Sequence, residues 1–111
     1  DGGMAMTMVE LETAVRERVR PIVVVFDNER YGMIRMYQDA ARGVRAVATD
    51  LGPVDFAAIG RALGGRGVRV ERDAEFEPAL REALTADRPT VLHCLVDRRW
   101  VSVNDHPFVG R

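Results

Sequence analysis

Apolar side chains recur along the first part of the chain at two different periods, which predict a helix followed by a strand. Met8, Leu11, Val15 and Val19 are three or four positions apart, so the segment 7–19 is predicted to be a helix with one apolar face. Pro21 ends that pattern. The run Ile22–Phe26 is apolar at every position, which is typical of a parallel strand covered on both faces.

The rest of the chain alternates helix-like and strand-like segments in the same way. Helices are expected over Tyr31–Gln38, over 53–63 with Pro53 at the first helical position, and after a cap at Asp73; strands are expected over Val68–Val70 and Thr90–Val96. A loop is expected at 39–52, and Gly64-Gly65 is a predicted helix stop. The pattern predicts an α/β fold, with an open, mostly parallel sheet and helices on both faces.

Glycine and acidic or amide side chains stand where the first predicted helix begins and where the first predicted strand ends. Gly2 and Gly3 let backbone N–H groups approach an anion, and Thr7 with Glu10 has the spacing of a capping box. Asp1-Gly2-Gly3 would then precede a helix N-terminus, which favours phosphate. Asn28 follows the strand, and the carboxyl ends of parallel strands share the edge where α/β proteins bind ligands.

A carboxylate beside a phosphate group needs a cation between them. Magnesium is held by one or two carboxylates together with substrate phosphates, in a shell of oxygen ligands. Asp1 would supply the carboxylate, Asn28 an amide oxygen, and Arg30 a backbone carbonyl. Each short stretch by itself is typical of a turn, but the two together, in this order, favour a magnesium–diphosphate site.

Composition narrows the class of protein. The 111 residues are enough for one domain; 47% are apolar and 30% charged, and the net charge of −1 argues against a nucleic-acid partner. No stretch approaches the roughly 18 apolar residues of a membrane span, and no signal peptide is visible. The one cysteine, Cys94, suits a reducing compartment, so we expect a cytoplasmic protein. Cys94 and His93 are predicted to be packing residues, and the tail from Asp97, which includes His106, has no assignable chemistry.

The pattern DGG, helix, VVVFDNERYG resembles the cofactor motif of thiamine-diphosphate-dependent enzymes: Gly-Asp-Gly, helix, strand, Asn-Asn. The resemblance implies that Asp1, Asn28 and the Arg30 carbonyl bind magnesium and that Gly2 and Gly3 contact the diphosphate. Asp27 stands where the motif has its first Asn. The run YGMIRMYQ resembles that of acetolactate synthases, which implies that the segment after Arg30 lies along the cofactor. The residues of that segment are Tyr31, Gly32, Met33 and Ile34.

The resemblance also implies an activity. We expect a single, incomplete and N-terminally truncated domain over 1–111, of the flavodoxin-like thiamine-diphosphate-binding fold, in an enzyme that decarboxylates 2-oxo acids with or without carboligation. The activating glutamate and the substrate pocket would come from a pyrimidine-binding domain of the same or a partner subunit, in a homo-oligomer. No catalytic residue is expected in this chain, and the chain alone should be inactive.

Two other functions stay open. A flavodoxin-like binding or regulatory domain would use Asp1 and Asn28 only to shape loops. A dinucleotide-binding enzyme domain is disfavoured, because no G-x-G-x-x-G follows a predicted strand.

Overall fold

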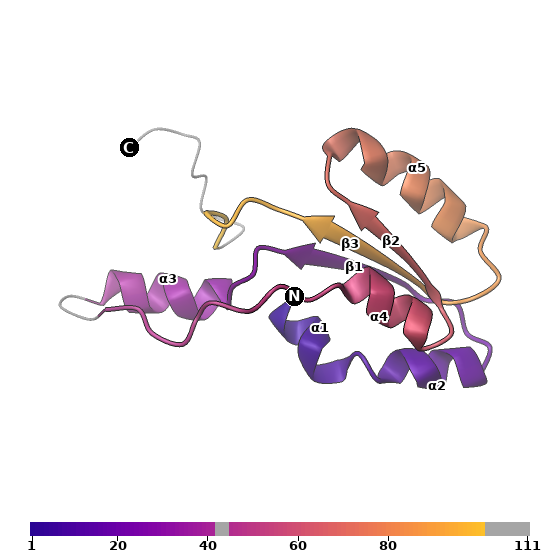
Figure 1. Ribbon diagram of the computed structural model, residues 1–111, viewed down its shortest axis with the longest axis horizontal. Coiled ribbons are helices and arrows are strands. Elements are labelled where there is room, and N and C mark those ends of the chain that lie inside the picture. The colour runs from indigo at the N-terminus through magenta and orange to yellow at the C-terminus, as the bar shows by residue number, and fades with distance from the viewer. Residues whose placement is uncertain (42–44, 102–111) are drawn as a thin grey trace.

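The computed structural model describes residues 1–41 and 45–101, which form a three-stranded parallel sheet with helices around it (Figure 1). The strand order is β1–β3–β2, so the last strand in sequence lies in the middle. In chain order the elements are α1 (Gly2–Thr7), α2 (Glu10–Arg16), β1 (Ile22–Asp27), α3 (Gly32–Ala40), α4 (Phe56–Ala62), β2 (Arg66–Val70), α5 (Asp73–Leu84) and β3 (Thr90–Leu95). The predicted α/β class and the parallel sheet are confirmed.

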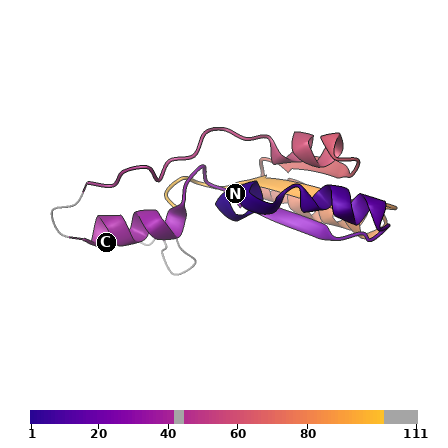
Figure 2. The same ribbon diagram turned by 90° about the horizontal axis from the view of Figure 1, so that it is seen from below.

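Side chains that alternate along the strands form two cores, one on each face of the sheet. On one face, Leu92 and Cys94 of β3 pack with Ala79 and Ala83 of α5. On the other face, a second cluster joins β1 and β3 to α2 and to the start of α4; it comprises Leu11, Val25, Phe56 and Val91. Figure 2, seen from below, shows the helices of the second face stacked against the strands. The prediction of helices on both faces is confirmed.

The first helix begins earlier than the sequence pattern predicted. α1 starts at Gly2, and its N-cap is Asp1, whose Oδ1 accepts from the Gly2 amide at 2.6 Å. The predicted capping box at Thr7 and Glu10 is therefore wrong: the Thr7 hydroxyl donates to the Gly3 carbonyl inside α1. The predicted continuous helix over 7–19 is also interrupted, because α1 ends at Thr7 and α2 begins only at Glu10.

Two other helix starts are also shifted. Pro53 lies outside α4, because Asp55 is its N-cap and accepts from the Ala58 amide at 2.8 Å. Asp73 is the first residue of α5 rather than its cap; Glu75 closes that helix start by accepting from the Arg72 amide at 3.1 Å. In both helices a carboxylate accepts from a backbone amide of the first turn or of the N-cap, which is the contact that fixes where the helix begins.

The remaining predictions concern the segments away from the sheet. α4 ends just before Gly64, whose φ of +91° is the left-handed conformation expected at a helix stop. α3 projects away from the sheet and has no buried residue (Figure 1). Parts of the predicted loop and tail, namely 42–44 and 102–111 with His106, lie outside the described residues. No helix in the described ranges is long and apolar enough to cross a membrane.

Candidate functional site

An open groove of about 820 Å³ lies at the carboxyl-terminal edge of β1 and β3. Its walls come from the ends of these strands, the start of α3 and the segment after β3. The lining residues are Asp1, Phe26, Asn28, Arg30, Gly32, Met33, Asp73, Leu95, Val96, Asp97, Trp100 and Val101. This is the edge at which ligands bind in open α/β sheets, so the groove is the candidate site.

Asp1 and Asn28 meet at one backbone amide within the groove. The Asp1 Oδ2 and the Asn28 Oδ1 each accept from the Arg30 N–H, at 3.1 Å in both cases. The backbone nitrogen of Asp1 donates to the Phe26 carbonyl at 3.0 Å, which holds the start of the chain beside the end of β1. The fold thus brings together two side chains that are far apart in sequence, as the sheet-edge rule led us to expect.

The backbone of Arg30 faces the same point. Arg30 forms an antiparallel bridge with Asp50, in which the hydrogen bonds are made by the neighbouring residues: Leu51 N to Glu29 O at 2.8 Å and Tyr31 N to Thr49 O at 2.9 Å. In such a bridge the N–H and C=O of the central residue both point away from the partner segment. The Arg30 carbonyl is therefore directed to the side on which Asp1 and Asn28 lie.

The glycines of the predicted site have different surroundings. A Cβ on Gly2 would lie 2.5 Å from the Tyr31 Cε1, so the Tyr31 ring packs directly on that backbone. A Cβ on Gly32 would lie 2.6 Å from the Val101 carbonyl oxygen. Around Gly3, by contrast, no atom lies within 4 Å of the Cβ position. Packing thus explains Gly2 and Gly32, whereas Gly3 faces open space that a ligand can occupy.

The two apolar residues of the predicted cofactor segment differ in whether they line the groove. Met33 lines the groove, whereas Ile34 does not; both side chains are largely exposed on α3, at 64% and 51%. Tyr31, Gly2 and Gly3 border the groove residues without lining the groove themselves.

The residues that meet at the Arg30 amide fit a magnesium ion by their chemistry. They offer a carboxylate, an amide oxygen and a backbone carbonyl, which are the hard oxygen ligands that Mg²⁺ prefers. Within 1–41 and 45–101, no cluster of three or more His, Cys, Asp and Glu side chains could hold a metal. A magnesium site with a single carboxylate therefore needs neutral oxygens of the protein, and oxygens of the bound small molecule, to complete its coordination shell.

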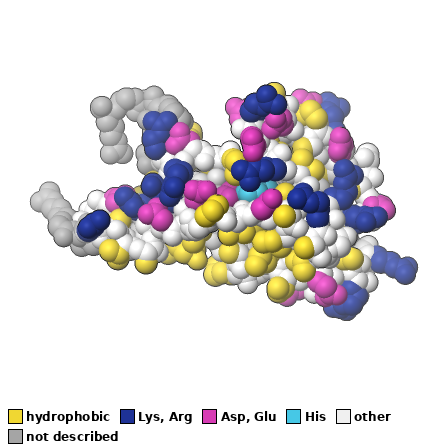
Figure 3. All heavy atoms as spheres, viewed as in Figure 1, with side chains coloured by type: hydrophobic (Ala, Val, Ile, Leu, Met, Phe, Trp, Pro, Cys, Tyr) yellow, Lys and Arg dark blue, Asp and Glu magenta, His cyan; other side chains and the backbone are white. Residues whose placement is uncertain are grey.

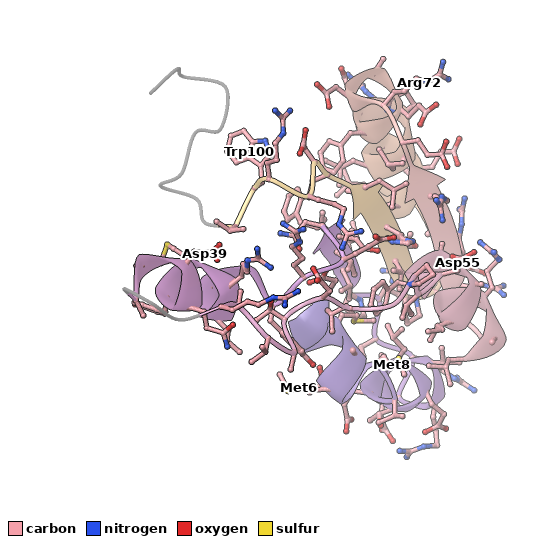
Figure 4. The ribbon with its side chains drawn as sticks, turned by 60° about the vertical axis from the view of Figure 1, so that its left-hand side comes forward. Met6, Met8, Asp39, Asp55, Arg72 and Trp100 are labelled. Carbon is pink, nitrogen blue, oxygen red and sulfur yellow. The ribbon has the colours of Figure 1, made fainter. Side chains whose placement is uncertain are left out.

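The segment after β3 closes one side of the groove, a role that the sequence did not suggest. The Asn28 Nδ2 donates a short hydrogen bond to the Trp100 carbonyl, and Figure 4 shows the Trp100 side chain projecting from that segment. The Arg99 guanidinium donates to Oδ1 of Asp97 through Nε and to Oδ2 through a terminal nitrogen, which lowers the pKa of that carboxyl to about 2. The Arg98 guanidinium lies 3.1 Å from Glu29. The Asn28–Trp100 and Arg98–Glu29 contacts attach residues 97–101 to the turn that carries Asn28, whereas the Arg99–Asp97 contact lies within that segment.

A buried polar pair also escaped the sequence prediction. His93, expected to be a packing residue, is 1% exposed, and its Nε2 lies 2.7 Å from the Oδ2 of Asp27, which is 5% exposed. The only signal in the sequence was an acidic residue at a strand end and a histidine in another strand. On the outer surface, in the view of Figure 1, charged side chains cross the middle of the molecule, and apolar side chains lie below them over α1 and α2 (Figure 3).

Taken together, the parallel sheet and the groove at its carboxyl-terminal edge define an open α/β domain of the kind that binds ligands at that edge. Comparison with known proteins identifies the family of this domain. Residues 1–94 match the family described as the thiamine pyrophosphate enzyme, C-terminal TPP binding domain, and the chain belongs to this family.

Relatives with different reactions share this domain. The chain is 35% identical over 99 residues to the catabolic acetolactate synthase of Raoultella terrigena, covering 89% of this chain and 18% of that protein. It is 38% identical over 95 residues to the sulfoacetaldehyde acetyltransferase of Castellaniella defragrans, covering 83% of this chain and 16% of that protein. The benzoylformate decarboxylase of Polynucleobacter necessarius superposes with a TM-score of 0.80 at 28% identity, over 88% of this chain and 18% of that one. The chain thus spans less than a fifth of the length of these relatives.

Proposed function

We propose that this chain binds the diphosphate of thiamine diphosphate through a magnesium ion held by Asp1, Asn28 and the Arg30 carbonyl. The observation that carries the proposal is the convergence of Asp1 Oδ2 and Asn28 Oδ1 on the Arg30 N–H, in a groove at the carboxyl-terminal edge of the sheet. The family match supports the identity of the cofactor. The same family match favours cofactor binding over the two alternative functions, those of a regulatory domain and of a dinucleotide-binding domain.

Each proposed residue has a distinct task. Asp1 brings the negative charge that fixes the cation and, as the N-cap of α1, holds that charge still. Asn28 adds a neutral oxygen, and its amide nitrogen ties the turn to Trp100. The open space around Gly3 lets a diphosphate oxygen come close to a first-turn amide, which has no partner within the helix. Met33 and the neighbouring Tyr31, Gly32 and Ile34 would lie along the rest of the cofactor.

We further propose that the chain is part of a cytoplasmic, homo-oligomeric, acetolactate-synthase-like enzyme that acts on 2-oxo acids. When bound, thiamine diphosphate supplies the chemistry that breaks the bond between the carboxylate and the carbonyl carbon. The named reactions of the relatives, which include a synthase, an acetyltransferase and a decarboxylase, support decarboxylation with or without transfer to an acceptor. The activating glutamate would come from a pyrimidine-binding domain, so residues 1–111 alone should release no carbon dioxide from pyruvate.

The test compares two charge-removing variants in the complete enzyme by calorimetry with thiamine diphosphate, with magnesium and with chelator. Asp1→Asn keeps an effective N-cap but removes the charge that holds the cation. Asp73→Asn removes the same charge from the wall of the same groove, away from the proposed ligands. We expect wild-type affinity to depend on magnesium, Asp1→Asn to lose at least tenfold, and Asp73→Asn to stay within twofold.

Two results would refute the proposal. If wild-type affinity for thiamine diphosphate is the same with magnesium and with chelator, no cation takes part in binding. An equal loss in Asp1→Asn and Asp73→Asn would show that only the general charge of the groove matters, and not coordination by Asp1.

A further inference from the structure

A cluster of three polar side chains, two of them buried, lies next to the turn that carries the proposed magnesium ligands, and the proposed function uses none of the three. It comprises Asp27 at the end of β1, His93 on the neighbouring strand β3, and Asp55 at the start of α4, whose side chain is 48% exposed and is labelled in Figure 4. The Asp27 and His93 side chains are 5% and 1% exposed. A buried carboxylate is costly unless it is paired and hydrogen-bonded, so this cluster requires an explanation.

The His93 ring is held in one orientation. Phe56 packs against it edge-on, with ring centroids 5.3 Å apart and planes at 90°. The Nε2 lies 2.7 Å from the Asp27 Oδ2, whereas the Nδ1 has no hydrogen-bond partner within the described residues and lies 3.8 Å from an Asp55 oxygen. We assign the Nε2 as the donor and the Asp27 Oδ2 as the acceptor of this hydrogen bond, which is the tautomer in which the imidazole offers Asp27 an N–H.

The other oxygen of Asp27 shapes the turn that follows β1. Its Oδ1 accepts from the Glu29 amide at 2.9 Å. Glu29 has a φ of +54°, a left-handed conformation that is uncommon for a residue with a side chain. The next amide is that of Arg30, which both Asn28 Oδ1 and Asp1 Oδ2 accept. Two sets of hydrogen bonds, one from His93 through Asp27 to the Glu29 amide and one from the Arg30 amide to the proposed metal ligands, are therefore joined by the backbone between Glu29 and Arg30.

We propose that His93 is a positioning residue for the magnesium turn and that it acts through Asp27. Its Nε2–H fixes the Asp27 carboxylate so that the other oxygen holds Glu29 in its left-handed conformation. Without that donor, the buried carboxylate is free to rotate, the Glu29 amide loses its acceptor, and the Arg30 amide no longer brings Asn28 and Asp1 together. This inference rests on the proposed function for the role of the turn, but the contacts themselves exist without the cofactor.

Two conservative variants separate this role from simple packing. The amide nitrogen of Gln reaches the position of the His Nε2, whereas that of Asn corresponds to the Nδ1 and falls short of Asp27. In the complete enzyme we expect His93→Asn to weaken magnesium-dependent binding of thiamine diphosphate at least tenfold, with kcat at saturating cofactor within twofold of wild type. His93→Gln should stay within threefold in affinity.

Val91→Ala is the matched control. Val91 lies on the same face of β3, is 1% exposed and packs with Phe56, but it is paired in register with Val23, four residues before Asp27 in β1. We expect it to lower the unfolding temperature while leaving cofactor affinity within twofold. Asp27→Ala provides a second route should His93→Asn fail to fold: it should show the same tenfold loss, and adding His93→Gln to it should cost no further affinity.

A readout without cofactor keeps this inference separate from the proposed function. Hydrogen exchange of the peptide amides across 27–31 in the cofactor-free protein should be at least tenfold faster in His93→Asn, and like wild type in His93→Gln. Equal exchange in both variants, or affinity losses that merely match Val91→Ala, would overturn the positioning role. Wild-type protein that binds no thiamine diphosphate would refute the proposed function, while the exchange experiment would still decide the contacts from His93 to the turn.

Discussion

Replacing Gly3 with Ala should stabilise the protein and weaken its cofactor binding at the same time. In the cofactor-free structure an added Cβ at this position meets no atom within 4 Å, so the fold does not require glycine there. Gly3 lies inside α1, and exchanging Gly for Ala at a compatible position stabilises a protein by about 0.4–1 kcal/mol. We therefore expect a small rise in the unfolding midpoint of the cofactor-free protein.

The same methyl group would stand where the proposed diphosphate approaches. Separating one amide from a charged acceptor forfeits a hydrogen bond worth about 1.5–3 kcal/mol, and 1.4 kcal/mol is about tenfold in affinity. Calorimetry with thiamine diphosphate and magnesium should therefore show a loss of about tenfold or more. The two effects have opposite signs, which no general destabilisation would produce.

Gly2→Ala is the contrasting variant one residue earlier. Its Cβ would lie 2.5 Å from a Tyr31 ring carbon, where ordinary carbon contacts are about 3.5–4.0 Å. The Tyr31 ring would have to move by roughly 1 Å, and such overpacking costs about 1–3 kcal/mol. Gly2→Ala should therefore lower both stability and affinity. If Gly3→Ala binds the cofactor as wild type does, Gly3 does not contact the diphosphate, and its place in the proposed site is refuted.

Two further predictions address the fold and the segment after β3. Gly67→Ala would place a Cβ 1.9 Å from the Ala57 carbonyl oxygen of α4, a backbone clash that should cost about 3 kcal/mol in unfolding free energy. Gly52→Ala, which meets no atom within 4 Å, should change it by less than about 0.5 kcal/mol, and equal effects would contradict the close packing of α4 on β2. The Asp97 pKa is lowered from 3.8 to about 2 in the folded protein, so the stability that Asp97 contributes is present above its unfolded pKa and is lost as the pH falls through about 2. An NMR titration should find that low midpoint in wild type and one nearer 3.8 in Arg99→Gln, and identical midpoints would exclude the Arg99 contact as the cause.

The sequence predicted the strands and the meeting of Asp1 with Asn28 because both follow from local rules. Continuous apolar runs mark parallel strands, and parallel strands put their carboxyl ends at one edge. The expectation that Ile22–Phe26 is covered on both faces is wrong at its last residue, because Phe26 lines the open groove and is 64% exposed. The start of the first helix depended on a choice between two suitable caps. Asp1 and Thr7 both have the chemistry, and the burial of Gly2 under the Tyr31 ring, a contact between distant parts of the chain, accompanies the earlier start at Asp1.

The partner of Asp27 could not be predicted, because it depends on strand order. Val25 of β1 is paired in register with His93 of β3, and His93 in turn with Arg69 of β2. Had β2 rather than β3 paired with β1, Arg69 would stand beside the end of β1 and could take the carboxylate. In the observed order, Arg69 instead donates to Glu71 at 2.7 Å at the surface, and the histidine of the central strand takes the buried position.

This arrangement has a consequence for the turn. An arginine would hold Asp27 with a flexible and always charged side chain, whereas the His93 ring is clamped by Phe56 and offers Asp27 a single donor. A single donor leaves the second oxygen of Asp27 available to the Glu29 amide. The central place of β3 therefore supplies both the burial and the limited hydrogen bonding that the Asn28–Arg30 turn requires.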